Sequence, residues 1–284
     1  IAPGRMVGLL GSNGSGKSTL IKLINGLLVP SSGQIFICGQ APGPETKAIV
    51  SYLPERTYLP DTVRVKGLLS FFRDFYTDFD AAKAEEMLQK LDIDPSSPLK
   101  TLSKGTREKV QLIMVMSRRA RVYILDEPTT GLDPQTRKTV WAVAEKLRRE
   151  EKMTVFLTTH YMEEAAKADY VVILDHGKIA AEGTPRQLKN EYTGDFIVVY
   201  GAKKDEFEEA FGKGSAGKIR EIADGVKIEV KDTAEAAEMI AAKPELFRDF
   251  EVLKGNMDDV FLAVTGKTLK EGENPDGKKN GGEK

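Results

Sequence analysis

A glycine-rich segment between an apolar strand and an amphipathic helix constrains this chain more than any other feature. Met6 to Leu10 (MVGLL) predicts a short buried strand, and apolar residues from Leu20 to Leu28 recur at the spacing of a helix packed on a sheet. Between them lies GSNGSGKS, residues 11–18, which fits the pattern G-x-x-x-x-G-K-[ST]. A strand, a glycine loop and a helix in this order predict an α/β fold with a phosphate-binding loop.

Each residue type in this loop has a chemical use. Glycines let successive backbone N–H groups converge on phosphate oxygens, and the N-terminus of the following helix adds positive potential. Lys17 can reach the terminal phosphates of a nucleotide, and the Ser18 hydroxyl can bind Mg²⁺. The alternative is a flexible glycine turn without a ligand, which the flanking strand and helix disfavour. We therefore expect the following residues to hold a nucleotide: Ser12, Asn13, Gly14, Ser15, Gly16, Lys17, Ser18 and Thr19.

A second apolar strand, Val122 to Leu125, ends in two carboxylates, Asp126 and Glu127. Such a strand end lies at the carboxyl edge of the sheet, beside a phosphate loop. Asp126 is predicted to hold Mg²⁺, directly or through water, and Glu127 to take a proton from the attacking water. Taken alone, this strand end is more often the start of a solvated loop. Together with the phosphate loop, it predicts a nucleotide-hydrolysing site.

Composition narrows the function classes. Lys and Arg total 42 against 43 Asp and Glu, so the formal charge of −1 gives no general attraction to nucleic acid or anionic lipid. The 284 residues favour two domains. No apolar run approaches the ~18 residues of a membrane span, and Ile1 opens the chain without the leader of a signal peptide. The single cysteine, Cys38, is expected to be a small buried hydrophobe.

The order of periodic segments predicts the domain organisation. Helical periodicity without strands over about 61–108 indicates a helical subdomain inserted into an α/β domain that spans 1–193. Gln34 to Cys38 is expected to form a strand. From Val110, helices and strands alternate, which favours a mostly parallel sheet covered by helices. Asp175-His176-Gly177 stands between two strand patterns and predicts a hairpin.

The pattern restarts after Gly194. The expected order is strand, helix, two strands, helix and strand, which is typical of a small split-βαβ domain over 194–266 and ends with a helix over Met257 to Val264. Residues 271–284 contain no apolar side chain, so we expect 267–284 to be a disordered tail.

With these motifs in place, the chain resembles the ATP-binding subunit of an ABC transporter over roughly residues 1–190. The resemblance rests on GSNGSGKST and YILDEP together with three further motifs. Leu102 to Thr106 (LSKGT) is similar to the family signature, Gly131-Leu132-Asp133 to its D-loop, and Thr159-His160 to its switch histidine. The implied fold is a P-loop NTPase (ABC ATPase) core with an inserted helical subdomain, followed by a small α+β domain.

The resemblance implies how a nucleotide is used. In the family, the phosphate loop of one copy and the signature of another clamp one ATP, so ATP with Mg²⁺ drives dimerisation of two ATP-binding subunits, identical or paired. Ser103 and the N–H of Gly105 are expected at the N-terminus of a helix that begins near Thr106, where they would form the second anion site. Asp133 is expected to contact the nucleotide. Lys17, Glu127 and His160 are expected to be the catalytic residues; an isolated histidine has no such role by default.

The family also implies partners. Its helical subdomain and Q-loop receive a cytoplasmic helix of a membrane-spanning permease, which places the chain peripherally on the cytoplasmic face of the cell membrane. The segment Met257 to Gly266 is similar to the closing segment of ATPases from the type-2 ABC exporters, which include antibiotic and multidrug efflux systems. Export is therefore favoured over import, and the transported substrate is not readable from this chain.

Several positions depart from the family pattern. Lys104 and Thr106 stand where the signature usually has glycine and glutamine, and Glu55 replaces the Q-loop glutamine. An ionised glutamate accepts but cannot donate a hydrogen bond, so its contact to Mg²⁺ or water would differ. Ten residues precede Gly11, too few to include the upstream aromatic that stacks on adenine in the family.

Two other functions stay open at this point. One is a soluble ABC-type ATPase of translation or DNA repair, although paired cassettes, long coiled-coil insertions and zinc cysteines are lacking here. The other is a nucleotide-dependent interaction module with little turnover, which the departures at Lys104, Thr106 and Glu55 would suit. Six basic residues between Lys104 and Arg121 are better explained by helix C-terminal placement than by nucleic-acid binding, so no nucleic-acid partner is expected.

Overall fold

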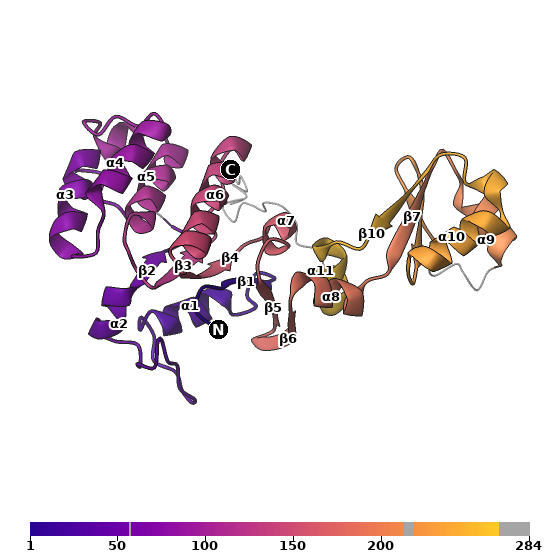
Figure 1. The fold of residues 1–284 in the computed structure, drawn as a ribbon, viewed down its shortest axis with the longest axis horizontal. Helices are drawn as coiled ribbons and strands as arrows, with labels where there is room; N and C mark the ends of the chain where they lie inside the picture. Colours follow the sequence, from indigo (N-terminus) through magenta and orange to yellow (C-terminus); the bar gives the residue numbers. More distant parts are fainter. Residues whose placement is uncertain (57, 213–218, 267–284) are drawn as a thin grey trace, which may run out of the picture. The chain divides into compact units, whose positions relative to one another are not determined.

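The computed structural model describes residues 1–56, 58–212 and 219–266 (Figure 1). The chain divides into two compact units, residues 1–188 and 189–284, each with a sheet of its own. The tail for which we predict disorder, residues 267–284, lies outside the described residues. Within the described part, no helix combines the length and the apolar character needed to cross a membrane.

The first unit contains a six-stranded sheet, helices that pack against it, and a separate group of helices, α3 to α5 (Figure 1). Its elements in chain order are β1 (Met6–Gly11), α1 (Lys17–Ile24), α2 (Pro44–Ile49), β2 (Val50–Leu53), α3 (Val65–Phe75), α4 (Ala81–Lys90), η1 (Leu99–Thr101), α5 (Lys104–Met116), β3 (Val122–Asp126), α6 (Pro134–Glu150), β4 (Thr154–Thr158), α7 (Met162–Ala165), β5 (Tyr170–Asp175), β6 (Lys178–Gly183) and α8 (Pro185–Tyr192), whose end passes into the second unit.

The strand order β2-β3-β4-β1-β5-β6 brings the predicted motifs to one edge of the sheet. Strands β2, β3, β4, β1 and β5 run parallel, with Leu9 of β1 level with Thr158 of β4 and Thr158 level with Asp126 of β3. The carboxyl ends of these strands therefore meet where β1 enters the phosphate loop, the position at which open α/β sheets bind ligands. The doubly buried, apolar β1 is typical of a central parallel strand.

The core of this unit forms where α1 covers the sheet. Ile21 of α1 is fully buried and belongs to one cluster with Val7 and Leu9 of β1, Ile124 of β3 and Phe156 of β4. The predicted hairpin is also confirmed: β5 and β6 pair antiparallel, and His176 and Gly177 between them both have positive φ. Two positive φ angles match the twist of the flanking strands.

Two local predictions are wrong, and one helix start differs by two residues. Gln34 to Cys38 is not a strand, because Ile37 pairs only with Gln40 across a tight turn. Cys38 lies in that turn and is exposed rather than buried. The helix expected near Thr106 begins two residues earlier, because the Ser103 hydroxyl accepts the N–H of Thr106 and caps a helix that starts at Lys104.

The second unit is a four-stranded antiparallel sheet in the order β10-β7-β9-β8. The element order β-α-β-β-α-β with this strand order is that of a split βαβ unit. Phe207, Ile197 and Val226 are among the buried side chains of its core. Its elements are β7 (Asp195–Tyr200), α9 (Lys204–Phe211), β8 (Ile219–Ile222), β9 (Gly225–Val230), α10 (Thr233–Ala242), η3 (Pro244–Leu246), β10 (Phe250–Lys254) and α11 (Met257–Thr265).

Candidate functional site

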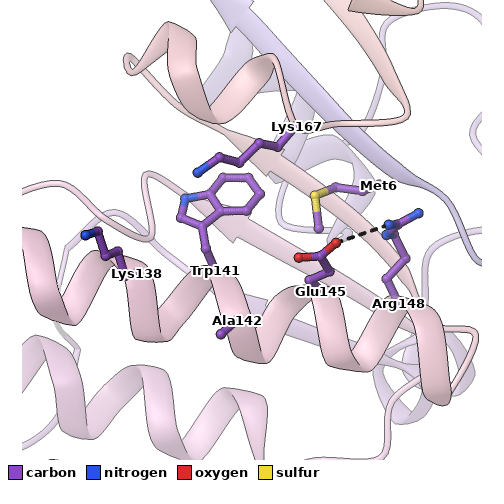
Figure 2. A pocket seen from close by; sticks show the side chains of 7 residues that line it. All are labelled: Met6, Lys138, Trp141, Ala142, Glu145, Arg148 and Lys167. Atoms are coloured by element: carbon purple, nitrogen blue, oxygen red, sulfur yellow. Dashed lines mark ion pairs between the residues drawn. The ribbon is translucent and has the colours of Figure 1, made fainter.

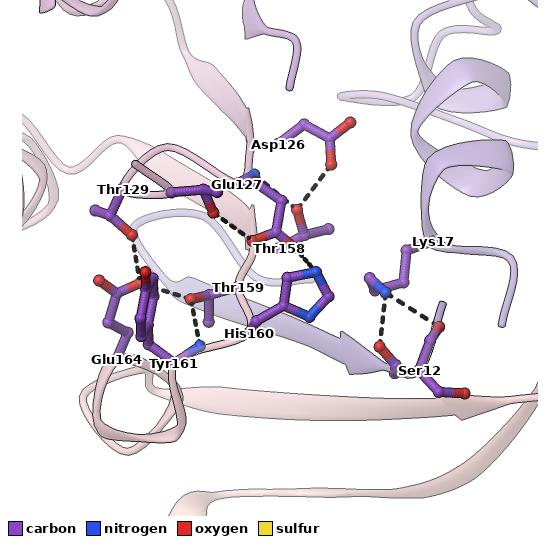
Figure 3. Close-up of polar contacts among 12 residues, drawn as sticks. Ser12, Lys17, Asp126, Glu127, Thr129, Thr158, Thr159, His160, Tyr161 and Glu164 are labelled. Atoms are coloured by element: carbon purple, nitrogen blue, oxygen red, sulfur yellow. Dashed lines mark hydrogen bonds and ion pairs between the residues drawn. The ribbon is translucent and has the colours of Figure 1, made fainter. Parts of the chain in front are cut away.

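The phosphate loop is folded around its own lysine. Lys17, the first residue of α1, donates from Nζ to the carbonyl oxygens of Gly11 at 2.6 Å and Ser12 at 3.3 Å (Figure 3). Burial lowers the pKa of Lys17, while the charges of Glu127, Asp126 and Glu55 oppose that shift. The ammonium group is thus held by neutral carbonyl oxygens, and phosphate oxygens would be stronger acceptors for it.

The backbone of the loop fits an anion. Gly16 caps α1 with a left-handed φ of 105° and offers no side-chain acceptor to the first-turn N–H groups, which therefore face the loop without a capping oxygen. At Gly11, a Cβ atom would lie 2.3 Å from Ser15 Oγ and 2.6 Å from the carbonyl oxygen of Leu174, so the loop closes only with glycine there. The Ser15 hydroxyl is buried and has no partner among the described residues. These features fit a nucleotide phosphate.

At the end of β3, one hydroxyl contacts both the Asp126 carboxylate and the backbone N–H of Glu127. Thr158, at the end of β4, donates from Oγ1 to Asp126 Oδ1 at 2.8 Å and accepts the N–H of Glu127 at 2.9 Å (Figure 3). Burial raises the pKa of Asp126, and the hydrogen bond from Thr158 opposes this shift. Thr158 thereby joins the end of β3 to the end of β4.

Glu127 and His160 face each other. Glu127 has a left-handed φ of 53°, which turns its side chain away from the strand direction. Its Oε2 accepts the Thr130 hydroxyl at 3.1 Å, and its Oε1 lies 3.0 Å from His160 Nε2. Burial raises the pKa of Glu127 to about 7 and lowers the pKa of His160. A carboxylate with a pKa near neutrality is suited to accept a proton at physiological pH.

Glu55 acts on this group through its charge. It follows β2 and is exposed, and its charge opposes the lowered pKa values of Lys17 and His160 and adds to the raised pKa values of Asp126 and Glu127. In the described part of the chain, no group of three or more His, Cys, Asp or Glu side chains could hold a metal ion by itself. Mg²⁺ at Ser18 and Asp126 would therefore complete its shell with phosphate and water oxygens, as this ion usually does.

The signature residues lie elsewhere in the first unit. Ser103 and Gly105 stand at the start of α5, and no hydrogen bond or ion pair joins them to the phosphate loop across the described ranges. Asp133 caps α6 by accepting the N–H of Thr136 at 2.9 Å and pairs with Lys109 at 3.2 Å. The structure therefore brings together the phosphate loop, Asp126, Glu127 and His160, whereas the residues of the predicted second anion site have no hydrogen bond to them among the described residues.

Sequence reasoning missed the hydroxyl groups that orient this site. Thr158 and Thr130 hold the two carboxylates, and Glu164 of α7 accepts from Thr129 and Thr159. Two threonine pairs, Thr129-Thr130 after β3 and Thr158-Thr159 before His160, are the signal for them in the sequence.

Trp141 belongs to a different place on the surface. It lines a cavity of about 270 Å³ on α6 with Met6 and Arg148 on one side and the Lys167 ammonium 5.6 Å above its ring (Figure 2). None of the predicted nucleotide-binding residues lines this cavity.

Comparisons with known proteins agree on one family. Residues 1–130 match the family described as ABC transporter. The Nod factor export ATP-binding protein I of Burkholderia orbicola is 34% identical over 94% of this chain and 90% of its own length. A solved ATP-binding subunit of an ABC transporter aligns with a TM-score of 0.61 at 32% identity, over 67% of this chain and 82% of that one. A dimeric ATP-binding cassette with bound ADP and Pi shares the fold, with a TM-score of 0.59 at 21% identity over 65% of this chain and 87% of that one.

The sheet order, the phosphate loop and the acidic strand end define a P-loop ATPase, which confirms the predicted fold class. The chain belongs to the ATP-binding subunits of ABC transporters, which bind and hydrolyse ATP.

Proposed function

We propose that this chain hydrolyses ATP with Mg²⁺ to power export through a separate membrane permease, and that it does so as a dimer of ATP-binding subunits. The observation that carries the proposal is the convergence of Lys17, Asp126, Glu127 and His160 at the carboxyl edge of the sheet. The export direction is supported by the names of relatives such as the Nod factor export ATP-binding protein.

The roles follow from the geometry. Residues 12–19 bind the phosphates, and the Lys17 ammonium exchanges loop carbonyls for phosphate oxygens. Ser18 and Asp126 would hold Mg²⁺, which when bound would supply neutralisation of negative charge on the phosphates. Glu127 accepts the proton of the attacking water, and His160 orients that carboxylate from 3.0 Å. Glu55 would lie on the side of Mg²⁺ or of a water bound to it.

The second anion site has no phosphate loop beside it in its own chain, which supports closure between two copies. Ser103 and Gly105 of one copy would contact the γ-phosphate bound to the other, and the first-turn N–H groups of α5 would add to that contact. Because ATP favours the closed state and loss of the γ-phosphate removes that bias, the nucleotide cycle opens and closes the dimer. Asp133 lies at the same interface.

A groove in the first unit suits a permease helix. A cavity of about 360 Å³ is lined by Leu27 near the end of α1, by Tyr52 and Pro54 at β2, by Tyr58 in the loop after β2, and by Tyr76 of the helical subdomain. Aromatic and aliphatic walls with few charges match an amphipathic helix. Docking there places the chain on the cytoplasmic face of the membrane.

Glu127→Gln tests the proposal. The amide keeps the shape of the side chain and cannot take a proton, so turnover with ATP and Mg²⁺ should fall by roughly 10² to 10⁴ fold. The variant should also accumulate as an ATP-bound dimer in size-exclusion chromatography. The exposed Glu163→Gln serves as the matched control.

Two other outcomes have distinct meanings. If the wild type and Glu127→Gln are equally inactive with the permease present, the chain is an interaction module without turnover. If the chain purifies stably without a membrane partner, under conditions that preserve related transporters, the proposal of a permease partner is contradicted.

A further inference from the structure

A buried glutamate joins the two loops that carry Glu127 and His160. Glu164 of α7 is 2% exposed, and its Oε2 accepts hydrogen bonds from Thr159 Oγ1 at 2.6 Å and from Thr129 Oγ1 at 3.0 Å. Thr129 follows β3 and Thr159 follows β4, so the two hydroxyls come from different loops. Figure 3 shows both converging on the same carboxylate.

The hydrogen bonds to Glu164 hold each loop at a threonine one or two residues from His160 or Glu127. Thr159 directly precedes His160, and its Oγ1 also accepts the N–H of Tyr161 at 3.0 Å, which closes the backbone around the histidine. Thr129 is two residues beyond Glu127, and the neighbouring Thr130 donates to the Glu127 carboxylate. One oxygen of Glu164 therefore ties together the backbones on which the 3.0 Å contact between His160 and Glu127 depends.

The rest of the Glu164 side chain points to a role beyond packing. Its Oε1 is buried and has no hydrogen-bond partner among the described residues. Buried polar atoms without a hydrogen-bond partner are uncommon in folded proteins, because leaving them unpaired costs free energy. An apolar residue at this position would avoid that cost but would leave two threonine hydroxyls without an acceptor.

We propose that Glu164 is a positioning residue for ATP hydrolysis, which sets the distance and orientation between His160 and Glu127 by fixing both loops to α7. The proposal rests on the functions proposed above for these two residues. It assigns Glu164 no contact with the nucleotide, so nucleotide binding should not depend on it.

The test compares substitutions at Glu164 in the full chain. Glu164→Ala removes the shared acceptor, and kcat should fall about 10- to 100-fold, the usual consequence of a small misplacement of catalytic groups. KM for ATP should change little. Glu164→Gln keeps an acceptor oxygen that can serve both hydroxyls, and it should recover most of kcat. Glu163→Ala, the exposed neighbour on α7, is the matched control.

The NMR signals of His160 provide a second measurement, which can be used when the ATPase activities of the variants are too low to compare. The sequence contains two histidines, His160 and His176, so the imidazole NMR signals of His160 can be assigned with a single variant. Glu164→Ala should move or broaden the His160 signals, whereas Glu164→Gln and Glu163→Ala should leave them near their wild-type positions. Circular dichroism establishes that each variant is folded.

The outcomes separate this inference from the proposed function. Unchanged His160 signals and unchanged kcat in folded Glu164→Ala overturn the positioning role, even when Glu127→Gln is inactive. An equal loss of kcat in Glu164→Ala and Glu164→Gln also overturns it, because the shared acceptor would then not be what matters. Wild-type turnover in Glu127→Gln counts against the proposed function instead.

Discussion

Arg118 stands in a run of basic residues between Lys104 and Arg121, yet the residue is 3% exposed. It donates to both carboxylate oxygens of Asp78 at 3.1 Å and to the carbonyl oxygens of Val50 and Ala48, and it stacks 3.9 Å from the ring centroid of Tyr76. Arginine suits such a position because its planar fork satisfies several acceptors at once. The Arg118 guanidinium therefore links Asp78 of the helical subdomain to β2 at the edge of the sheet.

Removing this group should destabilise the first unit. Arg118→Met keeps much of the side-chain volume but leaves Asp78 and two backbone carbonyls without their donor, which should cost about 3 kcal/mol, at the lower end of the range for a broken buried pair. Urea unfolding measures the loss. Arg119→Met is the matched control, because Arg119 is exposed and its guanidinium pairs with Asp80 at 2.8 Å. Equal effects of the two substitutions would contradict the structural role.

The positions of single site residues could be predicted where a chemical role requires one particular type of side chain. Lys17, Asp126 and Glu127 stand at fixed positions relative to strands that the apolar pattern reveals. Thr158 and Glu164 were not predictable, because their hydrogen bonds to Asp126 and Thr129 join residues 32 and 35 positions apart, which only the fold brings together. A threonine has no sequence pattern of its own that distinguishes an orienting hydroxyl from a surface one.

Helices and strands were likewise predictable where a local sequence signal marks them. Asp133 and Pro134 predict the start of α6, and the structure begins the helix at Pro134 with Asp133 as its cap. The Gln34 to Cys38 segment alternates like a strand but finds no neighbouring strand in the described chain, and strands are stable only when paired. Helix α8 was missed, because eight residues with one buried leucine carry little periodicity.

The hydrogen bonds of Asp195, which join three elements of the second unit, should make the stability of that unit depend on pH. Asp195 begins β7, and its Oδ2 accepts the hydroxyl of Thr233 on α10 at 2.6 Å and the ammonium of Lys254 on β10 at 3.1 Å. The hydrogen bond from Thr233, with that from Lys254, lowers the pKa of Asp195. A lowered folded-state pKa stabilises the fold above the unfolded-state value, about 4, and this contribution is lost as pH falls through the folded-state pKa.

Asp195→Asn should remove that dependence. Between pH 6 and about pH 3, near the ordinary aspartate pKa and below it, the unfolding temperature of the wild-type second unit should fall more steeply than that of the variant. At pH 6 the variant should be less stable than the wild type, because it lacks the charged partner of Lys254. Thermal unfolding followed by circular dichroism gives both slopes. Parallel slopes would show that Asp195 does not contribute.

At the scale of the whole molecule, the two units have separate hydrophobic cores. Ile21, Ile124 and Phe156 belong to the core beneath α1, whereas Ile197, Phe207 and Val226 belong to that of the split βαβ unit. Each core is enclosed by contiguous chain, residues 1–188 and 189–284. Units of this kind can unfold as separate cooperative steps, and only the first contains the phosphate loop.

Calorimetry of the full chain should therefore show two transitions that respond to different changes. ADP with Mg²⁺ at a hundred times its dissociation constant should stabilise the transition of the first unit by about 2.7 kcal/mol and leave the other in place. Asp195→Asn should lower only the transition of the second unit. A single transition that both changes move would mean that the units unfold together. A nucleotide effect on the Asp195-sensitive transition would contradict the assignment of the nucleotide site to residues 1–188.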